Sequence, residues 1–514
     1  MHTKIYSATT IGVNAYKVRV EVDLSVGIME FFIVGLADTA IKESRQRIRT
    51  ALKNSGIPLP PKKITVNLAP ANLKKEGTTF DLPIAIGILQ AAGVINISKE
   101  FLKETLFLGE LSLSGSIKPV KGVLPIAFDA TKLKKCRMIV PHKNQHEAAL
   151  IEDIEVIGVK NLVELIGYLQ GEKQIQPTHC LLQQLIEKES EKLLNFSQVK
   201  GQSQAKRALE ISAAGRHNIL FIGAPGAGKT MLAKRLPTIM PQMSFEEILE
   251  TSKVYSVSGK LGTKPLMTKR PFRCPHHTIS QAGLAGGGTY PQPGEISLAQ
   301  NGILFLDELT EFKRDTLEVL RQPLENKVVN ISRVNQSVTF PASFVLVAAL
   351  NPCPCGYWGD KRKDCTCSPQ RVNKYLDKLS GPLLDRIDLQ INIQSVKYET
   401  IEDKTTKVKS SQDILENVCK AAKKQKERGN GKTTWNANLS TDQIEQFCTL
   451  TPQAKEIIKK VFEKLSLSMR GYHKLLKVAR TIADLDETQN IDTKHVQEAL
   501  MYRSLDHMFE KKGY

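Results

Sequence analysis

The chain has 514 residues, 41% of them apolar, and its 72 basic and 53 acidic residues give a formal charge of +19. This length suits two to four domains, and the basic excess favours a polyanionic partner, although a basic surface without a function gives the same balance. The sequence has no run of 18 apolar residues and no signal-peptide pattern at its start, so we expect a cytoplasmic protein that enters no membrane. In that compartment its nine cysteines are expected to be reduced thiols.

Residues 1–175 are predicted to form an α+β domain. AYKVRVEVDL and KKITVNLAP have strand character, whereas DTAIKESRQRIRTALKNSG has helical spacing. A polar stretch over 176–190 is the expected linker. Strands and helices alternate over 191–395, which predicts a parallel α/β sheet. The nearly strand-free residues 396–514 predict a helical C-terminal domain.

A phosphate-binding loop is the strongest motif in the sequence. The apolar segment ILFI leads into a G-x-x-x-x-G-K-T pattern and then into a helical pattern, which is the context that a phosphate loop requires. Glycines let backbone N–H groups turn toward phosphates, and the helix N-terminus adds positive partial charge. The loop residues are Gly223, Ala224, Pro225, Gly226, Ala227, Gly228, Lys229 and Thr230. We expect ATP in this loop, with Lys229 on its phosphates and Thr230 on Mg²⁺.

Two further strands end in polar residues. NGILFL is followed by Asp307, which would hold Mg²⁺, and by Glu308, which would act on the attacking water. SFVLVAAL is followed by Asn351, which either orients that water or forms a turn before Pro352.

Two arginines are candidates for stabilising charge in phosphoryl transfer. Arg386 lies in GPLLDRIDL and Arg470 lies in SLSMRGYHKLLKVAR. An arginine that reaches the phosphates stabilises the transition state. Ion pairing at the surface is the alternative for both.

Two long segments contain no acidic residue. One covers 251–294 and the other covers 326–359. Glycines 283 and 286–288 permit a flexible hairpin tip in the first, and the second is predicted to hold a hairpin. Such basic loops would bind the phosphates of DNA without reading bases, and the alternative is an insert that packs subunits together. The candidate DNA contacts are Lys264, Lys269, Arg270, Arg273, Lys327 and Arg333.

Four cysteines follow the third strand in the pattern C-x-C-x₉-C-x-C. They are Cys353, Cys355, Cys365 and Cys367. Four thiols within 15 residues suit a tetrahedral Zn²⁺ site. Free thiols are the alternative, because the more diagnostic spacing is C-x₂-C.

Five blocks in order resemble the YifB/ComM branch of the magnesium-chelatase-like AAA+ ATPases. They are VKGQSQAKRALEISAAGRHNILFIGAPGAGKT, GGGTYPQPGEISLAQNGILFLDEL, LVAALNPCPCGY, LSGPLLDRIDL and SMRGYHKLLKVARTIADL. GLADTAIKESRQRIRTALKNSG is also similar to that branch, so the resemblance covers nearly the whole chain.

The resemblance implies an AAA+ P-loop core with a helical C-terminal lid. It implies Walker A roles for Lys229 and Thr230, Walker B roles for Asp307 and Glu308, and a sensor 1 role for Asn351. Arg386 is similar to the arginine finger that reaches a neighbouring subunit, and Arg470 to sensor 2. It further implies a homo-hexameric ring with the 251–294 insert in its pore, and branch migration of DNA during natural transformation.

The N-terminal domain resembles the proteolytic domain of Lon without its catalytic pair. Thr79 stands where the family has the nucleophilic serine, and Leu124 where it has the lysine base. A leucine cannot accept the proton, so we expect no protease activity. Two other functions stay open from the sequence: a metal-chelatase-type ATPase, and a chaperone that remodels a protein partner. The partner expected first is branched or single-stranded DNA.

Overall fold

A computed structural model describes residues 2–35, 38–57, 59, 61–73, 75, 77–179, 194–262, 264–288, 291–333, 336–360, 363–395, 409–429, 431, 434–464 and 467–503. The chain divides into two compact units. Unit 1 contains Met1–Glu189, Phe245–Thr268 and Ser332–Phe340, and unit 2 contains Ser190–Ser244, Lys269–Ile331 and Pro341–Tyr514. This division differs from the consecutive domains expected above, because two segments from the middle of the chain belong to unit 1. Part of the expected linker, from residue 180 on, lies outside the described residues.

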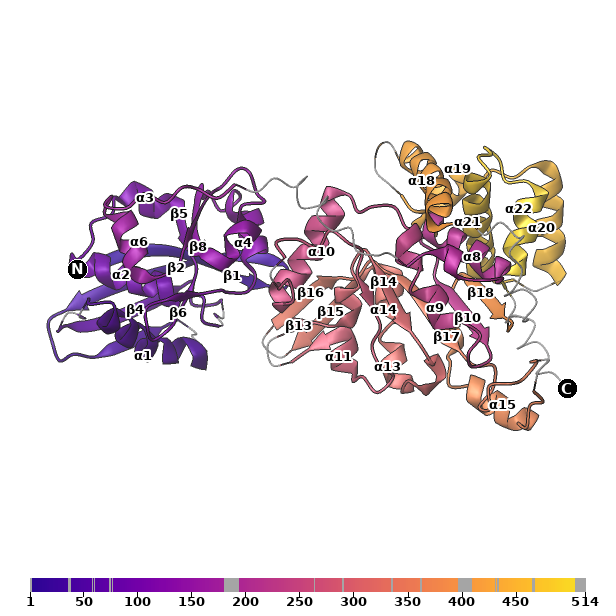
Figure 1. The fold of residues 1–514 in the computed structure, drawn as a ribbon, viewed down its shortest axis with the longest axis horizontal. Coiled ribbons are helices and arrows are strands. Elements are labelled where there is room, and N and C mark those ends of the chain that lie inside the picture. The colour runs from indigo at the N-terminus through magenta and orange to yellow at the C-terminus, as the bar shows by residue number, and fades with distance from the viewer. Residues whose placement is uncertain are drawn as a thin grey trace. The chain divides into compact units, whose positions relative to one another are not determined.

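Unit 1 contains a four-stranded sheet in the order β1-β2-β4-β3 (Figure 1). Its strands are β1 (His2–Ile11), β2 (Asn14–Ser25), β3 (Phe31–Val34) and β4 (Lys63–Ala69). Alternate residues of β2, from Val18 to Leu24, are buried, as the alternating pattern predicted. Helices α1 (Thr39–Asn54) and α2 (Asp81–Ala92) form one apolar core with this sheet. A second sheet is parallel and joins β5 (Thr105–Phe107), β8 (Arg137–Pro141) and β9 (Glu155–Val159).

Helix α10 (Phe245–Ser258) packs against α4 (Val123–Ala130) inside unit 1. The Lys253 ammonium lies 3.1 Å from the centre of the Phe128 ring. The Ser256 hydroxyl donates to the buried carboxylate of Glu147, and the Ser256 carbonyl accepts from the backbone N–H of Gly122 at 3.2 Å. Residues 245–258 are therefore an integral part of unit 1, although the 55 residues 190–244 separate them from its N-terminal part.

Unit 2 is built on a five-stranded sheet in the order β11-β14-β17-β10-β18, and every neighbouring pair is parallel. The strands are β11 (Phe272–Arg273), β14 (Ile303–Leu306), β17 (Val345–Leu350), β10 (Ile219–Gly223) and β18 (Leu389–Ile393). All residues of β10, β14 and β17 are buried, as is typical of central strands in a covered parallel sheet. Because the strands are parallel, the residues that follow β10, β14 and β17 meet at one edge of the sheet. The residues that precede the strands meet at the opposite edge.

The chain between β10 and β14 is not one continuous insert. Helix α10 belongs to unit 1, and β11 is a strand of the unit 2 sheet. Helix α11 (Gln281–Ala285) and the short pair β12 (Gly286–Gly287) and β13 (Gln292–Pro293) follow. The expected insert over 251–294 is therefore divided between the two units. The predicted second hairpin is present as β15 (Val328–Arg333) and β16 (Gln336–Pro341).

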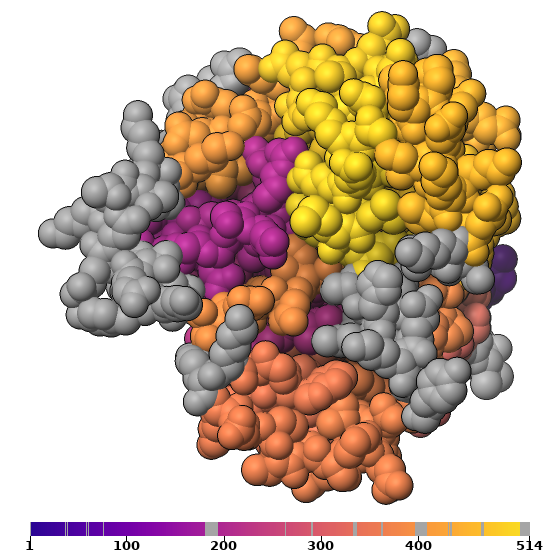
Figure 2. Space-filling view, turned by 90° about the vertical axis from the view of Figure 1, so that its right-hand side faces the viewer, coloured from indigo at the N-terminus to yellow at the C-terminus, as the bar shows by residue number. Residues whose placement is uncertain are grey.

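The described residues after 408 form the predicted helices. They are α18 (Ser411–Arg428), α19 (Thr441–Phe447), α20 (Pro452–Lys464), α21 (Met469–Leu485) and α22 (Thr493–Met501). Helices α18, α21 and α22 share an apolar core with α8 (Ser203–Gly215) and the sheet. Figure 2 shows these C-terminal helices in orange and yellow directly beside the magenta segment that contains α8.

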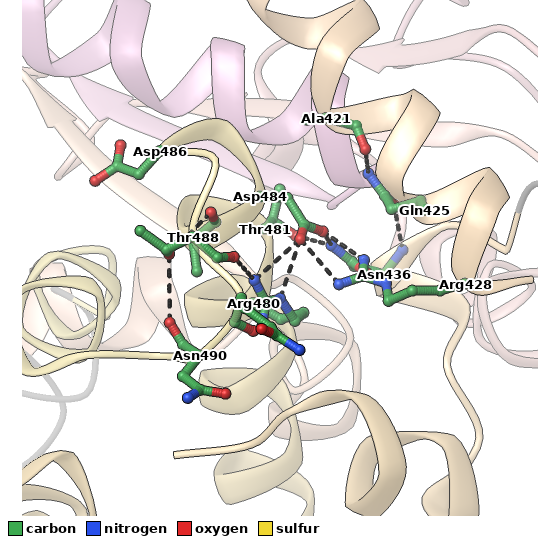
Figure 3. A network of polar contacts seen from close by, with 12 residues as sticks. Ala421, Gln425, Arg428, Asn436, Arg480, Thr481, Asp484, Asp486, Thr488 and Asn490 are labelled. Carbon is green, nitrogen blue, oxygen red and sulfur yellow. Dashed lines mark hydrogen bonds and ion pairs between the residues drawn. The ribbon is translucent and has the colours of Figure 1, made fainter. Parts of the chain in front are cut away.

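A buried charge network fixes the middle of this helical region (Figure 3). The Asp484 carboxylate accepts from Arg428 at 2.5 and 2.9 Å, from Asn436 at 2.8 Å and from Arg480 at 3.1 Å. The Arg480 guanidinium also donates to the carbonyls of Thr488 and Gln489. Asp484 and Arg480 lie on α21, so the network orients the helix whose first turn carries Arg470. In the part of the chain that the structure describes, no helix has the length and apolar character needed to span a membrane.

Candidate nucleotide site and arginine cleft

The phosphate loop has the conformation that its sequence predicted. It leaves β10 at Gly223 and enters α9 (Lys229–Ala233), and it turns through left-handed backbone at Gly226 (φ +76°) and Gly228 (φ +92°). A residue with a side chain is strained at such angles, which explains the two glycines. The Lys229 ammonium lies inside this loop and donates to the carbonyls of Gly223 at 2.5 Å and Ala224 at 3.1 Å. Burial lowers the pKa of Lys229 from its ordinary value.

The predicted Mg²⁺ ligands are neighbours at the same edge of the sheet. The Thr230 hydroxyl donates to the Asp307 carboxylate at 2.6 Å. A hydroxyl and a carboxylate beside a phosphate loop are the oxygen donors that Mg²⁺ takes in nucleotide sites. The residues therefore fit Mg²⁺ with ATP. Asn351 joins them, because its side-chain oxygen accepts from Lys229 at 2.9 Å.

Glu308 follows Asp307 in an unusual backbone conformation. Its φ is +51°, which places it in the left-handed region that residues other than glycine rarely occupy. Such strain is found at functional sites. The Glu308 carboxylate is more than half exposed, and it lies 3.6 Å from Nδ1 of His277. The strand end thus presents a carboxylate outward, where it can reach a water molecule.

Gln202 ties the preceding segment to the phosphate loop. Its side-chain amide donates to the carbonyl of Ala227 at 3.3 Å and to that of Gln394 at 2.6 Å. Gln202 itself has a φ of +57°. Gln202 therefore holds the segment before α8 against the phosphate loop.

Arg386 lies at the opposite edge of the sheet from Lys229. Its backbone carbonyl accepts from the side chain of Asn218 at 3.0 Å, and Asn218 directly precedes β10. Lys229 follows the other end of β10. Five strand residues span roughly 15 Å at about 3.3 Å per residue, so Arg386 is separated from the phosphate loop of its own chain by the length of the strand.

Arg470 lies with Arg386 rather than with the phosphate loop. Both guanidinium groups contact the same oxygen of Glu325, Arg386 at 2.7 Å and Arg470 at 2.5 Å. The two arginines hold the pKa of the Glu325 carboxyl below its ordinary value, Arg386 having the larger effect. Sequence motifs 84 residues apart therefore converge on one carboxylate.

These two arginines line a basic cleft of about 590 Å³ within unit 2. Its other cationic residues are Arg216, Lys327, Lys474 and Lys477, and its acidic residues are Glu325, Asp385 and Asp388. Burial lowers the pKa of Lys327, Lys474 and Lys477. The excess of cations suits a phosphate group.

The candidate DNA contacts occupy different places. Arg270 donates to the carbonyls of Pro241 and Asn301. Arg273 forms a two-bond ion pair with Glu295, at 2.6 and 2.8 Å. Both arginines thus have partners inside unit 2, which the acid-free segment alone did not indicate.

The remaining candidates are lysines and one further arginine. Lys327 lines the arginine cleft, and Lys264 and Lys269 follow α10. The side chain of Arg333 lies outside the described residues. A contact between any of these residues and DNA remains a prediction.

The four cysteines of the C-x-C-x₉-C-x-C pattern lie together in the structure. Their Sγ atoms all lie within 4.8 Å of one another, close enough to share one metal ion. In unit 1, the side chain of Leu124 is fully buried at the position expected for a lysine base, and the Thr79 carbonyl accepts from Gly109. Absence of protease activity remains a prediction.

Sequence reasoning did not identify His277 or Glu325 as site residues. The only sequence feature that drew attention to His277 was its position beside His276. No pattern distinguished Glu325 from other glutamates, because its partners come from distant parts of the chain.

A parallel sheet with a phosphate loop on one strand, paired carboxylates on another and a polar amide on the strand between defines a P-loop ATPase fold of the AAA+ class. The chain matches "Magnesium chelatase, subunit ChlI" over residues 195–401, "Subunit ChlI of Mg-chelatase" over 20–144, and "Magnesium chelatase, subunit ChlI C-terminal" over 408–503. It is 43% identical over 508 residues to the competence protein ComM of Haemophilus influenzae, covering 99% of this chain and 98% of that protein.

Two further relatives differ in how much of the chain they cover. YifB of Escherichia coli, an uncharacterized protein, is 40% identical over 507 residues, which cover 98% of this chain and 97% of that one. Lon protease 2 of Bacillus subtilis is 31% identical over 127 residues, or 24% of this chain and 22% of that protein. The chain belongs to the YifB/ComM family of magnesium-chelatase-like AAA+ ATPases.

Proposed function

We propose that this protein is an ATP-driven motor that forms a homo-hexameric ring and moves branched DNA. The observation that carries the ring is the position of Arg386 and Arg470 at one edge of the sheet, with the phosphate loop at the other. Two arginines suited to phosphates cannot serve the nucleotide of their own chain from there. A head-to-tail interface brings one subunit's second edge to the next subunit's first edge, and repetition of that interface closes a ring.

Each site residue has a role in this proposal. Lys229 and the loop amides bind the ATP phosphates, and Thr230 and Asp307 would hold Mg²⁺, which would offset the negative charge of those phosphates. Glu308 accepts a proton from the attacking water, and Asn351 positions that water. Arg386 and Arg470 of the adjacent subunit stabilise the charge that develops on the transferred phosphoryl group.

Glu325 has to exchange partners when the interface forms. In the single chain its carboxylate forms ion pairs with both guanidinium groups, at 2.5 and 2.7 Å, and so balances only one of their two charges. A phosphate group carries more charge than a carboxylate and accepts from both arginines. Glu325 therefore keeps the two arginines oriented into the cleft until a neighbouring nucleotide replaces it.

DNA is the proposed substrate for two reasons. The formal charge is +19, which favours a polyanion, and a relative that matches over nearly the whole chain is a competence protein. Branch migration of recombination intermediates during natural transformation fits both. The alternative is remodelling of a protein partner, in which case DNA has no effect on hydrolysis.

Subunit mixing tests the ring and the roles of both arginines. The Glu308→Gln and Arg386→Ala variants should each lose at least about 10²-fold in hydrolysis. In a randomly mixed ring, roughly a quarter of the interfaces combine an intact Glu308 with an intact Arg386. Mixing should therefore restore a readily measured part of the activity, and Arg470→Ala should complement Glu308→Gln in the same way.

Two mixtures serve as controls. In a mixture of Glu308→Gln with Lys229→Ala, every subunit has a defective nucleotide-binding edge. In a mixture of Arg386→Ala with Arg470→Ala, every subunit has a defective arginine edge. Neither should recover activity. Recovery in the second mixture would place Arg470 in the site of its own chain and contradict the proposed arrangement.

A further inference from the structure

We propose that Cys353, Cys355, Cys365 and Cys367 bind one zinc ion, and that this zinc holds the loop after β17 against the phosphate loop. The part of this inference that concerns nucleotide affinity rests on the function proposed above. The part that concerns the metal is independent of it.

The distances between the sulfur atoms fit one tetrahedral ion. Cys353 and Cys355 are 3.3 Å apart, Cys355 and Cys365 are 3.5 Å apart, and Cys353 and Cys365 are 3.6 Å apart. Zn–S bonds of about 2.3 Å place the corners of a regular tetrahedron about 3.8 Å from each other. A disulfide would need about 2.05 Å, so these thiols are arranged around a common centre and not in pairs.

The donor set indicates which metal and which kind of site. Thiolates are soft ligands that select zinc, copper(I) or iron, and four of them form the closed site typical of structural zinc. A backbone amide also faces the cluster, because the N–H of Cys367 donates to the sulfur of Cys365 at 3.4 Å. Such donors stabilise a thiolate beside a metal.

The cluster connects the end of β17 with the start of α15 (Pro369–Leu376), two elements of unit 2. Cys353 is fully buried and lies two residues after Asn351, which contacts Lys229. Cys365 and Cys367 directly precede α15, whose N-terminus is capped by Ser368. One ion would therefore close a loop from the end of β17 to the start of α15, and it would stabilise the loop by restricting its alternative conformations.

Gly356 places this loop directly on the nucleotide site. Its φ is +85°, and its N–H donates to the carbonyl of Cys353 at 2.9 Å. A Cβ atom at this position would lie 2.6 Å from Cδ and 2.8 Å from Cγ of Pro225 in the phosphate loop. The residue after Cys355 thus packs closely against the Pro225 ring of the phosphate loop. Asn351, which precedes the cluster in the chain, contacts the lysine of the same loop. Loss of the metal would free both supports.

The first measurement is the metal content of the full chain, purified without a metal-affinity step. We expect one zinc per chain by atomic emission. Cys365→Ser and Cys353→Ser should each lose it, and Cys136→Ser should keep it, because Cys136 is an exposed thiol outside the cluster. Protein reconstituted with cobalt(II) should show the thiolate charge-transfer absorption of a tetrahedral sulfur site. Wild-type protein that holds neither zinc nor cobalt would overturn the site, and stoichiometric iron would overturn the choice of zinc.

The second measurement is the affinity for a fluorescent ATP analogue, with and without zinc. Removal of the ion from wild-type protein with a chelator avoids reliance on variants that fail to fold. We expect about tenfold weaker binding after removal, because the loop is no longer organised before binding, and recovery when zinc is returned. Unchanged affinity would overturn the proposed link to the phosphate loop. If the zinc-loaded protein itself did not bind the analogue, the proposed ATPase function would be wrong, while the zinc measurement would stand.

Discussion

At the scale of single residues, the nucleotide site depends on side chains that belong to three neighbouring strands. Lys229, Asp307 and Asn351 follow β10, β14 and β17. Lys229 was predicted from the phosphate-loop pattern, and the other two from apolar strands that end in polar residues. The parallel register brings them together, and Lys229 contacts Asn351 at 2.9 Å while Thr230 contacts Asp307 at 2.6 Å. Glu325 is different, since its importance comes only from its two arginine partners.

Glu308→Gln should separate binding from chemistry. A missing general base is expected to lower the single-turnover rate of ATP hydrolysis by about 10²–10⁴-fold. ATP affinity should stay nearly unchanged, because the Glu308 carboxylate faces His277 at 3.6 Å and is more than half exposed. Glu311→Gln is the matched control, an exposed glutamate one turn later. A large loss of affinity in Glu308→Gln would show that this carboxylate instead helps to form the binding site.

Glu325→Gln should ease assembly of the active interface. Each partly exposed ion pair is worth about 0.2–1 kcal/mol, and Glu325 competes with nucleotide for two of them. The ATP concentration that gives half-maximal hydrolysis should therefore fall by roughly two- to thirtyfold, with little change in the maximal rate. Glu318→Gln is the control, because it removes an ion pair with Arg321. It should leave the half-maximal ATP concentration and the maximal rate unchanged.

A different result would assign Glu325 another role. If its substitution lowered the maximal rate as much as Arg386→Ala does, the carboxylate would take part in hydrolysis itself.

At the scale of elements, strand–loop–helix order was predictable and charge placement was not. Strands β10, β14 and β17 and the helices after residue 408 follow from apolar spacing, and the hairpin of β15 and β16 lies inside the segment 326–359 where one was expected. The acid-free segment 251–294 suggested a single basic insert, but it contains part of α10, the core strand β11 and α11. Local composition could not show that Arg273 pairs with Glu295 across 22 residues, because that pairing depends on the tertiary path of the chain.

The buried network around Asp484 should dominate the stability of the helical region. Asp484→Ala leaves Arg428 and Arg480 without their shared carboxylate, and removal of one partner from a buried ion pair costs about 3–5 kcal/mol. Urea unfolding followed by circular dichroism measures this loss. Glu445→Ala on the exposed face of α19 is the control and should change the free energy of unfolding by less than about 0.5 kcal/mol. Equal effects of the two substitutions would contradict the assigned role.

At the scale of the whole molecule, the two units are not consecutive in the chain. Unit 1 needs residues 245–268 from the middle of the sequence, and α10 contributes the hydroxyl of Ser256 to the buried carboxylate of Glu147. Sequence patterns predicted the helix but gave no information about which unit it joins. Because segments of the two units alternate along the sequence, the chain passes from one unit to the other more than once.

A fragment of residues 1–179 should therefore be less stable than the same fragment fused through a flexible linker to residues 245–268. Without α10, Glu147 loses a donor at a buried site, which costs about 1–3 kcal/mol, and the face of α4 beneath α10 is exposed. Urea titration of the two fragments measures the difference. Equal midpoints would show that α10 contributes nothing to unit 1.

The central claim is that ATP hydrolysis in a ring of these chains moves branched DNA. The most direct measurement is the rate of ATP hydrolysis with and without a four-way DNA junction, at several salt concentrations, with junction dissociation followed on a gel. For a ring that moves branched DNA, we expect stimulation that weakens with salt, and ATP-dependent dissociation that is lost in Glu308→Gln. Hydrolysis that is indifferent to the junction, with no dissociation, would contradict the account and direct attention to a protein substrate.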